Sequence, residues 1–205
     1  MNILFIGAHT DDIEIGAGGT LHYFAHQSDV NIHYLSFSLC QDLSRNRLIK
    51  HDQTNVKTYL QNIGVNVEMF DLRNRFFPDY SVEIRSILEV VQDRLKPDMV
   101  FTHWMGDIHQ DHKTVAEESR RVFKTQTLLS YEIIRSSPQF TANFFVSLNK
   151  EEIDGKIKLL SLYNTQRDLY YVRENTMYAL AQTRAAEIDK QYAEGFNIIR
   201  IVQGI

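Results

Sequence analysis

This 205-residue sequence has a single cysteine, no long apolar run and no block of basic residues. Because Cys40 has no second cysteine to pair with, an internal disulfide framework is excluded and a reducing compartment is compatible with the sequence. No stretch reaches the roughly 20 apolar residues that a membrane-spanning helix needs. The apolar N-terminal segment, Met1 to Gly7, is too short for a signal peptide and is better explained as a strand. We therefore expect a cytoplasmic protein without a membrane span.

The charge of the chain does not indicate a nucleic-acid partner. The formal net charge is -4, and lysine and arginine are not concentrated in any segment. Hydrophobic residues make up 43% and charged residues 23% of the sequence, which is ordinary for a soluble globular protein. A chain of this length is long enough for one substantial core but short for two, so we expect one domain over residues 1–205.

Two common catalytic or cofactor motifs are also missing. The sequence has no G-x-S-x-G, so a serine nucleophile of the α/β-hydrolase type is not expected. Gly16, Gly18 and Gly19 do not form the G-x-G-x-x-G of a dinucleotide site. The strand expected before them ends near Gly7, too far away, and the last position of the motif is Leu21. These glycines are better explained by close backbone packing, or by amide groups presented at a helix N-terminus.

Short β-branched or aromatic runs alternate with longer amphipathic stretches, as in βαβ units around a parallel sheet. The expected strands are Asn2 to Gly7, Val30 to Phe37, Val67 to Asp71, Met99 to His103, Leu129 to Ile134, Asn143 to Leu148 and Phe196 to Val202. The expected helices are Gly18 to Gln27, Asp52 to Asn62, Ser81 to Leu95, His112 to Phe123, Lys150 to Tyr163 and Thr176 to Tyr192. The expected fold class is therefore α/β, with a Rossmann-like, mostly parallel sheet flanked by helices.

A histidine and two aspartates follow the first expected strand. In the segment Ala8 to Glu14, the side chains of His9, Asp11 and Asp12 would lie at the carboxyl edge of the sheet, where open α/β sheets bind ligands. Adjacent side chains there point in different directions, so one aspartate can bind a metal while the other accepts a proton from water. A single aspartate would more often cap the following helix. The combination favours a functional site, without deciding which aspartate binds the metal.

A second cluster, Asp107 to His112, follows the expected strand that ends at His103. His109 and His112 are spaced i, i+3 at the start of an expected helix, which would place both imidazoles on one face. Asp111 lies between them, and a carboxylate in such a place can orient an imidazole and stabilise its charge. A lone histidine at a helix start is more often a cap or a packed residue, but two histidines with two aspartates indicate function. Together the two clusters predict one metal site built from distant segments.

The remaining histidines and the loops carry weaker signals. We assign four scattered histidines to the surface or to packing, namely His22, His26, His33 and His51. Two segments that follow expected strands and carry arginines are the candidate functional loops, Asp42 to Lys50 and Asp71 to Tyr80.

At both clusters the sequence resembles the LmbE-like, or PIG-L, family of zinc-dependent N-acetylglucosaminyl deacetylases. That family carries A-H-P-D-D-x-E followed by G-x-G-G-T, and residues 8–20 are AHTDDIEIGAGGT, with Thr10 in place of the proline. The D-x-H-x-D-H signature is present unaltered from Asp107 to His112. A weaker similarity to the family's Y-A-E-x-F is found from Tyr192 to Phe196, so the resemblance spans most of the chain. Proline at position 10 would fix φ, so we expect threonine to loosen the turn slightly.

The resemblance implies a role for each residue of the two clusters. The implied ligands of the metal are His9, Asp12 and His112. The implied metal is Zn²⁺, although histidine and aspartate also suit Fe²⁺ or Mn²⁺. Asp11 would be the general base. His109 would polarise the carbonyl or supply a proton, with Asp111 behind it.

The resulting hypothesis is a metal-dependent hydrolase that removes the acetyl group from an N-acetylated amino sugar or its conjugate. The expected partner is this small-molecule substrate, and a homo-oligomer is compatible with the resemblance because family members often form oligomers. Arg75 and Arg135 are candidates to bind an anionic part of the substrate, although any single arginine is more often exposed to solvent than bound to a ligand. Two alternatives stay open, a hydrolase of another amide and a non-catalytic sugar- or nucleotide-binding protein of this fold. The intact set Asp11, His109 and Asp111 argues against the second, because pure binding needs no base beside a metal ligand.

Overall fold

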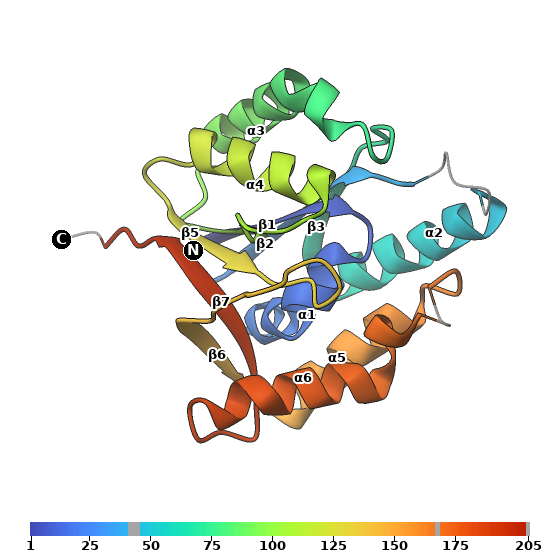
Figure 1. Cartoon of the computed structure of the whole chain (residues 1–205), viewed down its shortest axis with the longest axis vertical. Coiled ribbons are helices and arrows are strands. Elements are labelled where there is room, and N and C mark those ends of the chain that lie inside the picture. Colours follow the sequence, from blue (N-terminus) through green and yellow to red (C-terminus); the bar gives the residue numbers. More distant parts are fainter. Residues whose placement is uncertain (41–45, 167–168, 204–205) are drawn as a thin grey trace.

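The computed structural model describes residues 1–40, 46–166 and 169–203, without the side chains of residues 46–51. The described chain forms a seven-stranded sheet with helices on both faces (Figure 1). The strands are β1 (Asn2–His9), β2 (Asn31–Ser38), β3 (Val65–Met69), β4 (Met99–His103), β5 (Thr127–Tyr131), β6 (Phe144–Leu148) and β7 (Tyr192–Arg200). The α-helices are α1 (Asp12–Ala25), α2 (Asn46–Asn62), α3 (Ser81–Leu95), α4 (Gln110–Val122), α5 (Lys150–Ser161) and α6 (Glu174–Ala186), and the short 3-10 helices are η1 (Phe77–Tyr80) and η2 (Tyr170–Val172). In the described part of the chain, none of these helices has the length and hydropathy needed to cross a bilayer.

The order of the strands in the sheet is β3-β2-β1-β4-β5-β7-β6. Strands β1 to β5 are parallel, whereas β7 pairs antiparallel with both β5 and β6. The chain runs outward from β1 to β3 and then resumes on the other side of β1 at β4. In such a doubly wound sheet, ligands bind beyond the carboxyl ends of the strands at this switch point. The prediction of a Rossmann-like, mostly parallel α/β sheet is confirmed.

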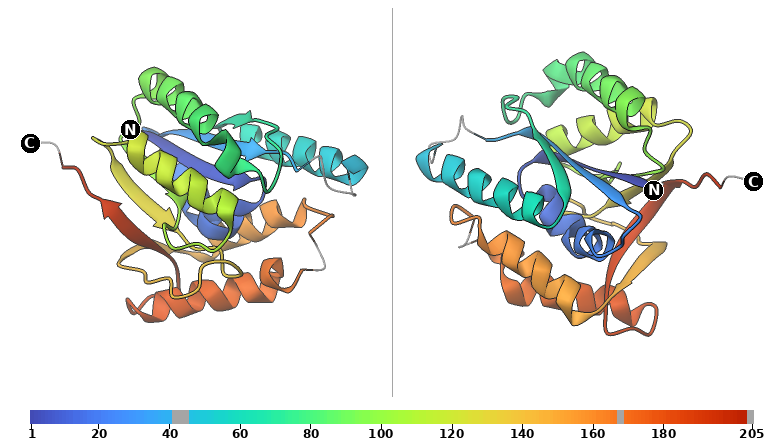
Figure 2. Two further views of the ribbon diagram at one scale, coloured as in Figure 1. Left: turned by 45° about the horizontal axis from the view of Figure 1, so that its top comes forward. Right: turned by 180° about the vertical axis from the view of Figure 1, so that it is seen from behind.

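The alternating side chains of β1 are buried on both faces of the sheet. Ile3 and Phe5 pack in a core with residues of α1, α2, α5 and α6, whereas Leu4 and Ile6 pack in a core with residues of α3 and α4. Figures 1 and 2 show the same two layers, with α3 and α4 together on one side of the sheet. The strand has no solvent-facing side, as expected for a parallel sheet that is covered twice. Polar side chains at its carboxyl end are therefore held in poorly solvated surroundings.

Helix α1 begins earlier than the sequence predicts, at Asp12 rather than at Gly18. Glycine disfavours helix formation, but tertiary packing overrides that preference here. A Cβ atom at Gly16 would lie 2.1 Å from the ring of Tyr131, so only glycine allows this approach. The helix is not regular, because Ala17 has non-helical angles of φ -144° and ψ 17°. The prediction that these glycines permit close backbone packing is confirmed.

The two candidate loops have more regular structure than we expected. Helix α2 begins at Asn46, so the second half of the segment Asp42 to Lys50 is helical. Residues 41–45 of that segment lie outside the described residues. The segment Asp71 to Tyr80 ends in the short helix η1. Its first part follows β3 at the carboxyl edge of the sheet, where Arg75 N donates to the Asp111 carboxylate.

The C-terminal elements also differ in their bounds from the prediction. The helix expected to reach Tyr192 ends at Ala186, and β7 begins at Tyr192 rather than at Phe196. Asp189, between them, has a left-handed φ of 55°, through which an α-helix does not continue. Strands β3 and β5 likewise begin before their predicted first residues. The segment Tyr192 to Phe196 is therefore part of a strand.

Candidate metal centre and active site

The first cluster lies where β1 passes into α1. His9 is the last residue of β1 and Asp12 is the first residue of α1, and the Asp12 carboxylate accepts a hydrogen bond from the His9 backbone N–H at 2.7 Å. Asp11 occupies the N-cap position, but its side chain makes no capping hydrogen bond. Its backbone is left-handed, with a φ of 100°, which non-glycine residues adopt rarely. Helix capping therefore does not explain Asp11, and all three side chains are buried at the switch point.

Thr10 contributes a hydrogen bond that the proline of the related motif lacks. Its N–H donates to the carbonyl oxygen of Ser38 on β2 at 3.2 Å, and its side chain is buried. Proline has no N–H and could not make this bond. Threonine thus anchors the turn to the neighbouring strand. This differs from our expectation that threonine loosens the turn.

The second cluster lies between β4 and α4. His109 is the N-cap residue of α4, and its Nδ1 accepts a hydrogen bond from the Asp111 backbone N–H at 3.2 Å. The ring of His112 stacks against that of His109, with centroids 4.4 Å apart. The prediction that these imidazoles lie together is confirmed, although His109 precedes the helix and is not part of it. Asp107 accepts a hydrogen bond from the His109 N–H at 2.8 Å and stabilises the turn.

Three side chains from the two clusters bring their ligand atoms together. His9 Nδ1 lies 3.3 Å from His112 Nε2 and 3.3 Å from Asp12 Oδ2, and His112 Nε2 lies 3.4 Å from Asp12 Oδ1. A metal held tetrahedrally by bonds of about 2.0–2.1 Å has its ligand atoms about 3.3–3.4 Å apart. Imidazole nitrogen and carboxylate oxygen are also the ligand atoms that Zn²⁺ accepts. The predicted ligand set therefore fits a divalent cation in its chemistry, and the spacing of the two imidazole nitrogens, each beside one oxygen of the Asp12 carboxylate, fits it in distance.

Each imidazole of this set bonds a second carboxylate through its far nitrogen. His9 Nε2 lies 3.0 Å from Asp111 Oδ2, and His112 Nδ1 lies 3.1 Å from Asp107 Oδ2. A neutral imidazole that donates from the far nitrogen carries its lone pair on the near nitrogen. The lone pairs of His9 Nδ1 and His112 Nε2 are then directed toward Asp12. This carboxylate–histidine arrangement is typical of metal sites.

Two serines that the sequence did not single out hold the carboxylate behind His112. Ser136 Oγ and Ser137 Oγ donate to Asp107 Oδ2 at 2.9 Å and 3.0 Å. Burial would raise the pKa of Asp107, but the hydrogen bond and the charge of His112 lower it. Asp107 therefore stays ionised and accepts the His112 N–H. No local motif marks the serines, which follow β5.

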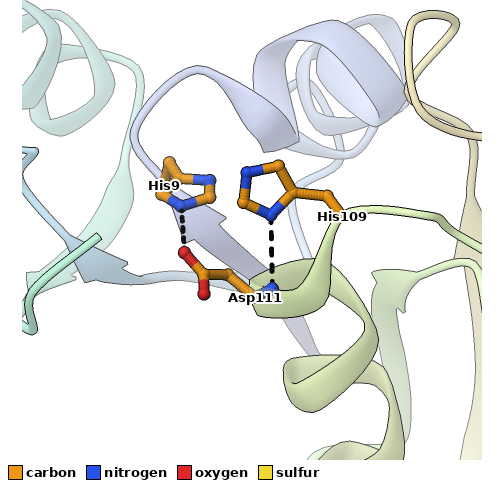
Figure 3. A group of neighbouring side chains, drawn as sticks. All are labelled: His9, His109 and Asp111. Carbon is orange, nitrogen blue, oxygen red and sulfur yellow. Dashed lines mark hydrogen bonds and ion pairs between the residues drawn. The ribbon is translucent and has the colours of Figure 1, made fainter. Parts of the chain in front are cut away.

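The carboxylate of Asp111 lies behind His9 and not behind His109. Figure 3 shows it bonded to His9, while His109 meets only the backbone N–H of Asp111. The same carboxylate accepts hydrogen bonds from Arg75 N at 2.6 Å and from Phe77 N at 3.2 Å. The expectation that Asp111 supports His109 is wrong, because the N-cap position turns the His109 ring toward the backbone of the first helical turn. Asp111 instead joins a candidate metal ligand to the loop after β3.

The charges around Asp12 oppose the effect of its burial. Burial would raise the pKa of Asp12, but His112, His103 and His9 hold it well below its ordinary value. Burial would lower the pKa of His112, but Asp12 and the hydrogen bond to Asp107 raise it to about 9. An ionised carboxylate is thus surrounded by groups that can carry positive charge. A metal cation would compete with protons for the same imidazole nitrogens.

Asp11 and His109 have the opposite electrostatic environments. Burial raises the pKa of Asp11 well above its ordinary value, and the negative charges of Asp12 and Glu14 raise it further. Burial lowers the pKa of His109 to about 4, and the two neighbouring imidazoles contribute to this shift. Asp11 therefore binds a proton readily, whereas His109 stays neutral near pH 7.

Glu14, the last residue of the first motif, supports the cavity from the protein interior. It is fully buried, and its Oε1 accepts hydrogen bonds from Tyr163 Oη at 2.7 Å and from Tyr34 Oη at 3.1 Å. Burial raises the pKa of Glu14 to about 7. Tyr163 lines the cavity, so Glu14 positions a cavity residue and does not contact a ligand itself.

His103, at the end of β4, is a site residue that sequence reasoning missed. Its Nε2 accepts a hydrogen bond from Ala8 N at 2.9 Å and lies 3.2 Å from Asp12 Oδ2. Its ring stacks on that of His112, with centroids 4.1 Å apart, and the side chain is fully buried. The sequence feature that could have identified His103 is its position at the carboxyl end of an expected strand, a few residues before the second cluster. His103 packs directly against two of the three candidate metal ligands.

The histidines assigned to packing or to the surface lie away from this cluster. His22 is buried in α1, where its Nδ1 lies 2.7 Å from the carbonyl oxygen of Gly18. His26 is exposed and His33 is partly buried. The side chain of His51 lies outside the described part of the structure. The assignment is confirmed for the three histidines whose side chains are described.

A cavity of about 700 Å³ opens beside the two clusters. The predicted residues that line it are His9, Asp11, Asp12, His109 and His112. Arg75 and Arg135 line it as well, and among the described residues no carboxylate forms an ion pair with either guanidinium. The Arg135 guanidinium lies 5.4 Å from the ring centroid of Tyr171, another lining residue. The structure therefore brings both predicted substrate-binding arginines to the same cavity as the candidate metal ligands.

The chain is similar to proteins that share its fold but differ in their named reactions. It is 23% identical over 168 residues to "Uncharacterized deacetylase YaiS" of Escherichia coli K12, covering 80% of this chain and 90% of that protein. The N,N'-diacetylchitobiose deacetylase from Pyrococcus horikoshii aligns with a TM-score of 0.76 at 21% identity, over 97% of this chain and 83% of that one. GalB, the 4-carboxy-2-hydroxymuconate hydratase from Pseudomonas putida KT2440, aligns with a TM-score of 0.77 at 16% identity, over 100% and 99%. Because a hydratase shares the fold, the fold alone does not define the reaction.

The family match covers the part of the chain that contains both clusters. The PIG-L family, described as GlcNAc-PI de-N-acetylase, matches residues 4–123, which is more than half of the 205 residues. The matched range includes every candidate metal ligand from His9 to His112. The resemblance inferred from the two motifs is confirmed, and the chain belongs to the PIG-L family of de-N-acetylases.

Proposed function

We propose that this chain is a metal-dependent hydrolase that removes the acetyl group from an N-acetylated amino sugar or its conjugate. The observation that carries the proposal is the geometry of His9, Asp12 and His112 beside the cavity. The two imidazole nitrogens lie 3.3 Å apart, and each lies within 3.4 Å of one oxygen of the Asp12 carboxylate. Both imidazoles are oriented by carboxylates on their far side. Membership of the PIG-L family adds the reaction class.

The cation would be held by His9 Nδ1, the Asp12 carboxylate and His112 Nε2. We propose Zn²⁺, for which these ligand types and distances are suitable, and the same ligands also suit Fe²⁺ or Mn²⁺. When bound, such a cation supplies Lewis-acid chemistry, lowering the pKa of water toward about 7 and polarising an acyl oxygen. Asp107 and Asp111 would keep the two imidazoles in the orientation that binding requires.

Asp11 is the general base in this proposal. It lines the cavity beside Asp12, and among the described residues no side chain donates a hydrogen bond to its carboxylate. Its raised pKa makes the ionised carboxylate a good proton acceptor, and a cation held by Asp12 would favour the ionised form. Asp11 takes a proton from the attacking water, whose oxygen adds to the acetyl carbonyl carbon. When the C–N bond breaks, Asp11 returns the proton to the leaving amine, and acetate and the amino sugar are released.

His109 is the proposed donor to the carbonyl oxygen. Its Nδ1 accepts a hydrogen bond from Asp111 N, so the proton of the neutral ring lies on Nε2. Its pKa, lowered to about 4, keeps the ring neutral near pH 7. A neutral N–H can stabilise the negative charge that develops on the acyl oxygen in the transition state. This geometry supports polarisation by His109 rather than proton transfer, the two roles that the resemblance left open.

Arg75 and Arg135 are proposed to bind an anionic part of the substrate. They reach the cavity from the loops after β3 and β5, and neither pairs with a described carboxylate. Guanidinium groups bind carboxylate and phosphate through paired hydrogen bonds. The cavity volume of about 700 Å³ is in the range of sites for drug-sized ligands, which leaves room for an aglycone beyond the acetylated sugar.

Acetate release by the purified chain tests this proposal. N-acetylglucosamine and its phosphate- or carboxylate-bearing conjugates are supplied with Zn²⁺, and the metal content of the protein is measured in parallel. Metal-dependent acetate release that is lost in Asp11→Asn supports the proposal. A chain that neither contains nor takes up stoichiometric divalent metal would favour a non-catalytic binding protein. Turnover confined to N-acyl compounds that are not sugars would favour a hydrolase of another amide.

A further inference from the structure

The irregular position in α1 is occupied by side chains from two distant segments. Ala17 departs from helical geometry, with φ -144° and ψ 17°. In a regular α-helix the N–H of Gly19 would donate to the carbonyl oxygen of Ile15, four residues earlier. Here Gly19 N donates to Glu194 Oε1 at 3.0 Å, and the Ile15 oxygen accepts a hydrogen bond from Lys156 Nζ at 2.7 Å. Side chains therefore provide hydrogen-bond partners for the backbone N–H and the backbone carbonyl that lose their helical partners at the break.

Lys156 and Glu194 also form an ion pair with each other. Their Nζ and Oε1 atoms are 2.6 Å apart, and the side chains are only 3% and 4% exposed. Glu194 Oε2 accepts a further hydrogen bond from Thr20 N at 2.7 Å. Buried charges are tolerated when they are paired and hydrogen-bonded, and both charges of this pair meet that condition. The ion pair takes the place of the regular helical hydrogen bond at the break.

The glycines of the first motif make room for this pair. A Cβ atom at Gly18 would lie 3.0 Å from Lys156 Cγ, and one at Gly19 would lie 3.3 Å from Glu194 Cδ and 2.6 Å from Leu148 Cδ1. Glu194 is the acidic residue of the third motif, Tyr192 to Phe196, to which the proposed mechanism gives no role. The glycines and the glutamate, far apart in the sequence, therefore form one structural unit with Lys156.

The break lies one turn beyond the aspartates of the candidate site. Ile15, whose carbonyl oxygen binds Lys156, donates its own N–H to the Asp11 carbonyl oxygen at 2.9 Å. Ile15 also lines the cavity. Asp12 begins the same turn of α1. The position of Ile15 therefore determines where the first turn of α1 presents both aspartates.

We propose that Lys156 and Glu194 are positioning residues for the metal site, acting through the break in α1. The pair keeps the first turn at an angle to the rest of the helix, and this angle directs Asp12 toward the two imidazoles. Without the pair, α1 can regain the regular hydrogen bond across the break and move Asp12 away from them. The inference rests on the proposed function, because it takes Asp12 as a metal ligand.

The variant that decides the question replaces both partners, Lys156→Met together with Glu194→Gln. Glu194→Gln alone leaves the Lys156 charge buried without a counter-ion, which can unfold the protein for an unrelated reason. The double variant has no such charge, but its single amide oxygen cannot accept from both backbone N–H groups. We expect its dissociation constant for Zn²⁺ to rise about tenfold, the lower end of the effects of groups that orient metal ligands. Chelator competition measures this at a temperature where circular dichroism shows a folded chain.

A second ion pair provides the matched control. Arg184 and Glu132 are 2.7 Å apart and largely buried. They line the same small pocket as Lys156 and Glu194, but Arg184 donates its hydrogen bonds to Glu132 and Glu187 and not to α1. Arg184→Met with Glu132→Gln should lower the thermal stability and leave Zn²⁺ affinity unchanged. If the Lys156→Met, Glu194→Gln variant does not fold, Lys156→Gln with Glu194→Gln replaces it, since this variant also leaves no unpaired buried charge and its amide at position 156 supplies an N–H donor in place of the ammonium group.

The outcomes separate this inference from the proposed function. A wild-type chain that binds no divalent metal overturns the proposed function. A wild-type chain that binds Zn²⁺, together with a folded variant of Lys156 and Glu194 that binds it equally well, overturns the positioning role. A purely structural pair would lower the melting temperature without changing the affinity of the folded protein for Zn²⁺.

Discussion

Asp111 offers a sharp test of the site, because its one carboxylate serves a candidate metal ligand and a loop of the cavity. It accepts hydrogen bonds from His9 Nε2, Arg75 N and Phe77 N. The amide of Asp111→Asn offers one acceptor oxygen, and its NH₂ group faces an N–H donor whichever way it is turned. With the NH₂ group toward His9, the imidazole must move its proton to Nδ1. That nitrogen then no longer has a lone pair for the metal.

The size of the effect follows from these contacts. Replacing a carboxylate that orients a metal-binding histidine lowers metal affinity by about 10- to 100-fold, or about 1.4 to 2.8 kcal/mol. Asp111 is 0% exposed, so water cannot replace the lost acceptor. An unsatisfied N–H at Arg75 or Phe77 lowers the free energy of unfolding by a further ~1–3 kcal/mol. The loop that carries Arg75 would also loosen, so KM should rise more for an anionic substrate than for a neutral one.

Three measurements on Asp111→Asn test this prediction. Chelator competition gives the Zn²⁺ affinity, acetate release from a neutral and an anionic substrate gives the two KM values, and urea unfolding gives the stability. Asp93→Asn is the control, because Asp93 is exposed on α3 and should change none of the three quantities. An Asp111→Asn variant that binds Zn²⁺ as tightly as the wild type would refute the orienting role of Asp111 at His9.

Three further predictions concern the base, the arginines and a buried histidine. Asp11→Asn should lower kcat by about 10²- to 10⁴-fold in the acetate assay while the metal content stays constant, because the base is lost and the ligands remain. Arg75→Met and Arg135→Met should each raise KM for a phosphate- or carboxylate-bearing substrate by about 10- to 100-fold, since hydrogen bonds to charged groups contribute ~1.5–3 kcal/mol, with little change for a neutral N-acetyl sugar. Burial lowers the pKa of His22 from 6.5, so the unfolded chain takes up a proton that the folded chain excludes. The contribution of His22 to the free energy of unfolding, measured with urea, should therefore be fully present above pH 6.5 and decrease below it, by at most about 1.4 kcal/mol for each pH unit.

Each of these predictions has an outcome that contradicts it. Undiminished kcat in Asp11→Asn would assign the base to another group. Equal KM changes for charged and neutral substrates would rule out anion binding by the arginines, and Lys113→Met, an exposed cation outside the cavity, is the control. For the pH dependence, His22→Gln should reduce the loss of stability below pH 6.5, to which His103 and His109 also contribute because burial lowers their pKa, so an unchanged profile would assign the whole loss to other residues.

Both halves of the candidate site could be predicted from the sequence because each half is local. His9, Asp11 and Asp12 lie at one strand-to-helix junction, and His109 and His112 lie at another. The alternation of strands and helices placed both junctions at the carboxyl edge of a parallel sheet, where they meet. The sequence pattern alone was therefore enough to expect that the two clusters come together.

Packing between distant segments decided the features that the sequence did not predict. His103 marked only a strand end, yet it stacks on His112 and contacts Asp12. The glycines near the start of α1 made a helix that begins after them appear more favourable. In the structure their missing side chains make room for Tyr131 beside Gly16, Lys156 beside Gly18, and Leu148 and Glu194 beside Gly19. Helix propensity is a weak preference that such tertiary contacts override.

The sequence by itself determined the chemistry of this protein, namely which imidazoles and carboxylates are available and on which turns they lie. The tertiary structure alone decided their pairing, with Asp111 behind His9 and Lys156 and Glu194 at the break in α1. Spacing along a strand or helix follows from the regular geometry of the backbone. A contact between segments a hundred residues apart depends on how whole elements pack, and no local pattern in the chain encodes that arrangement.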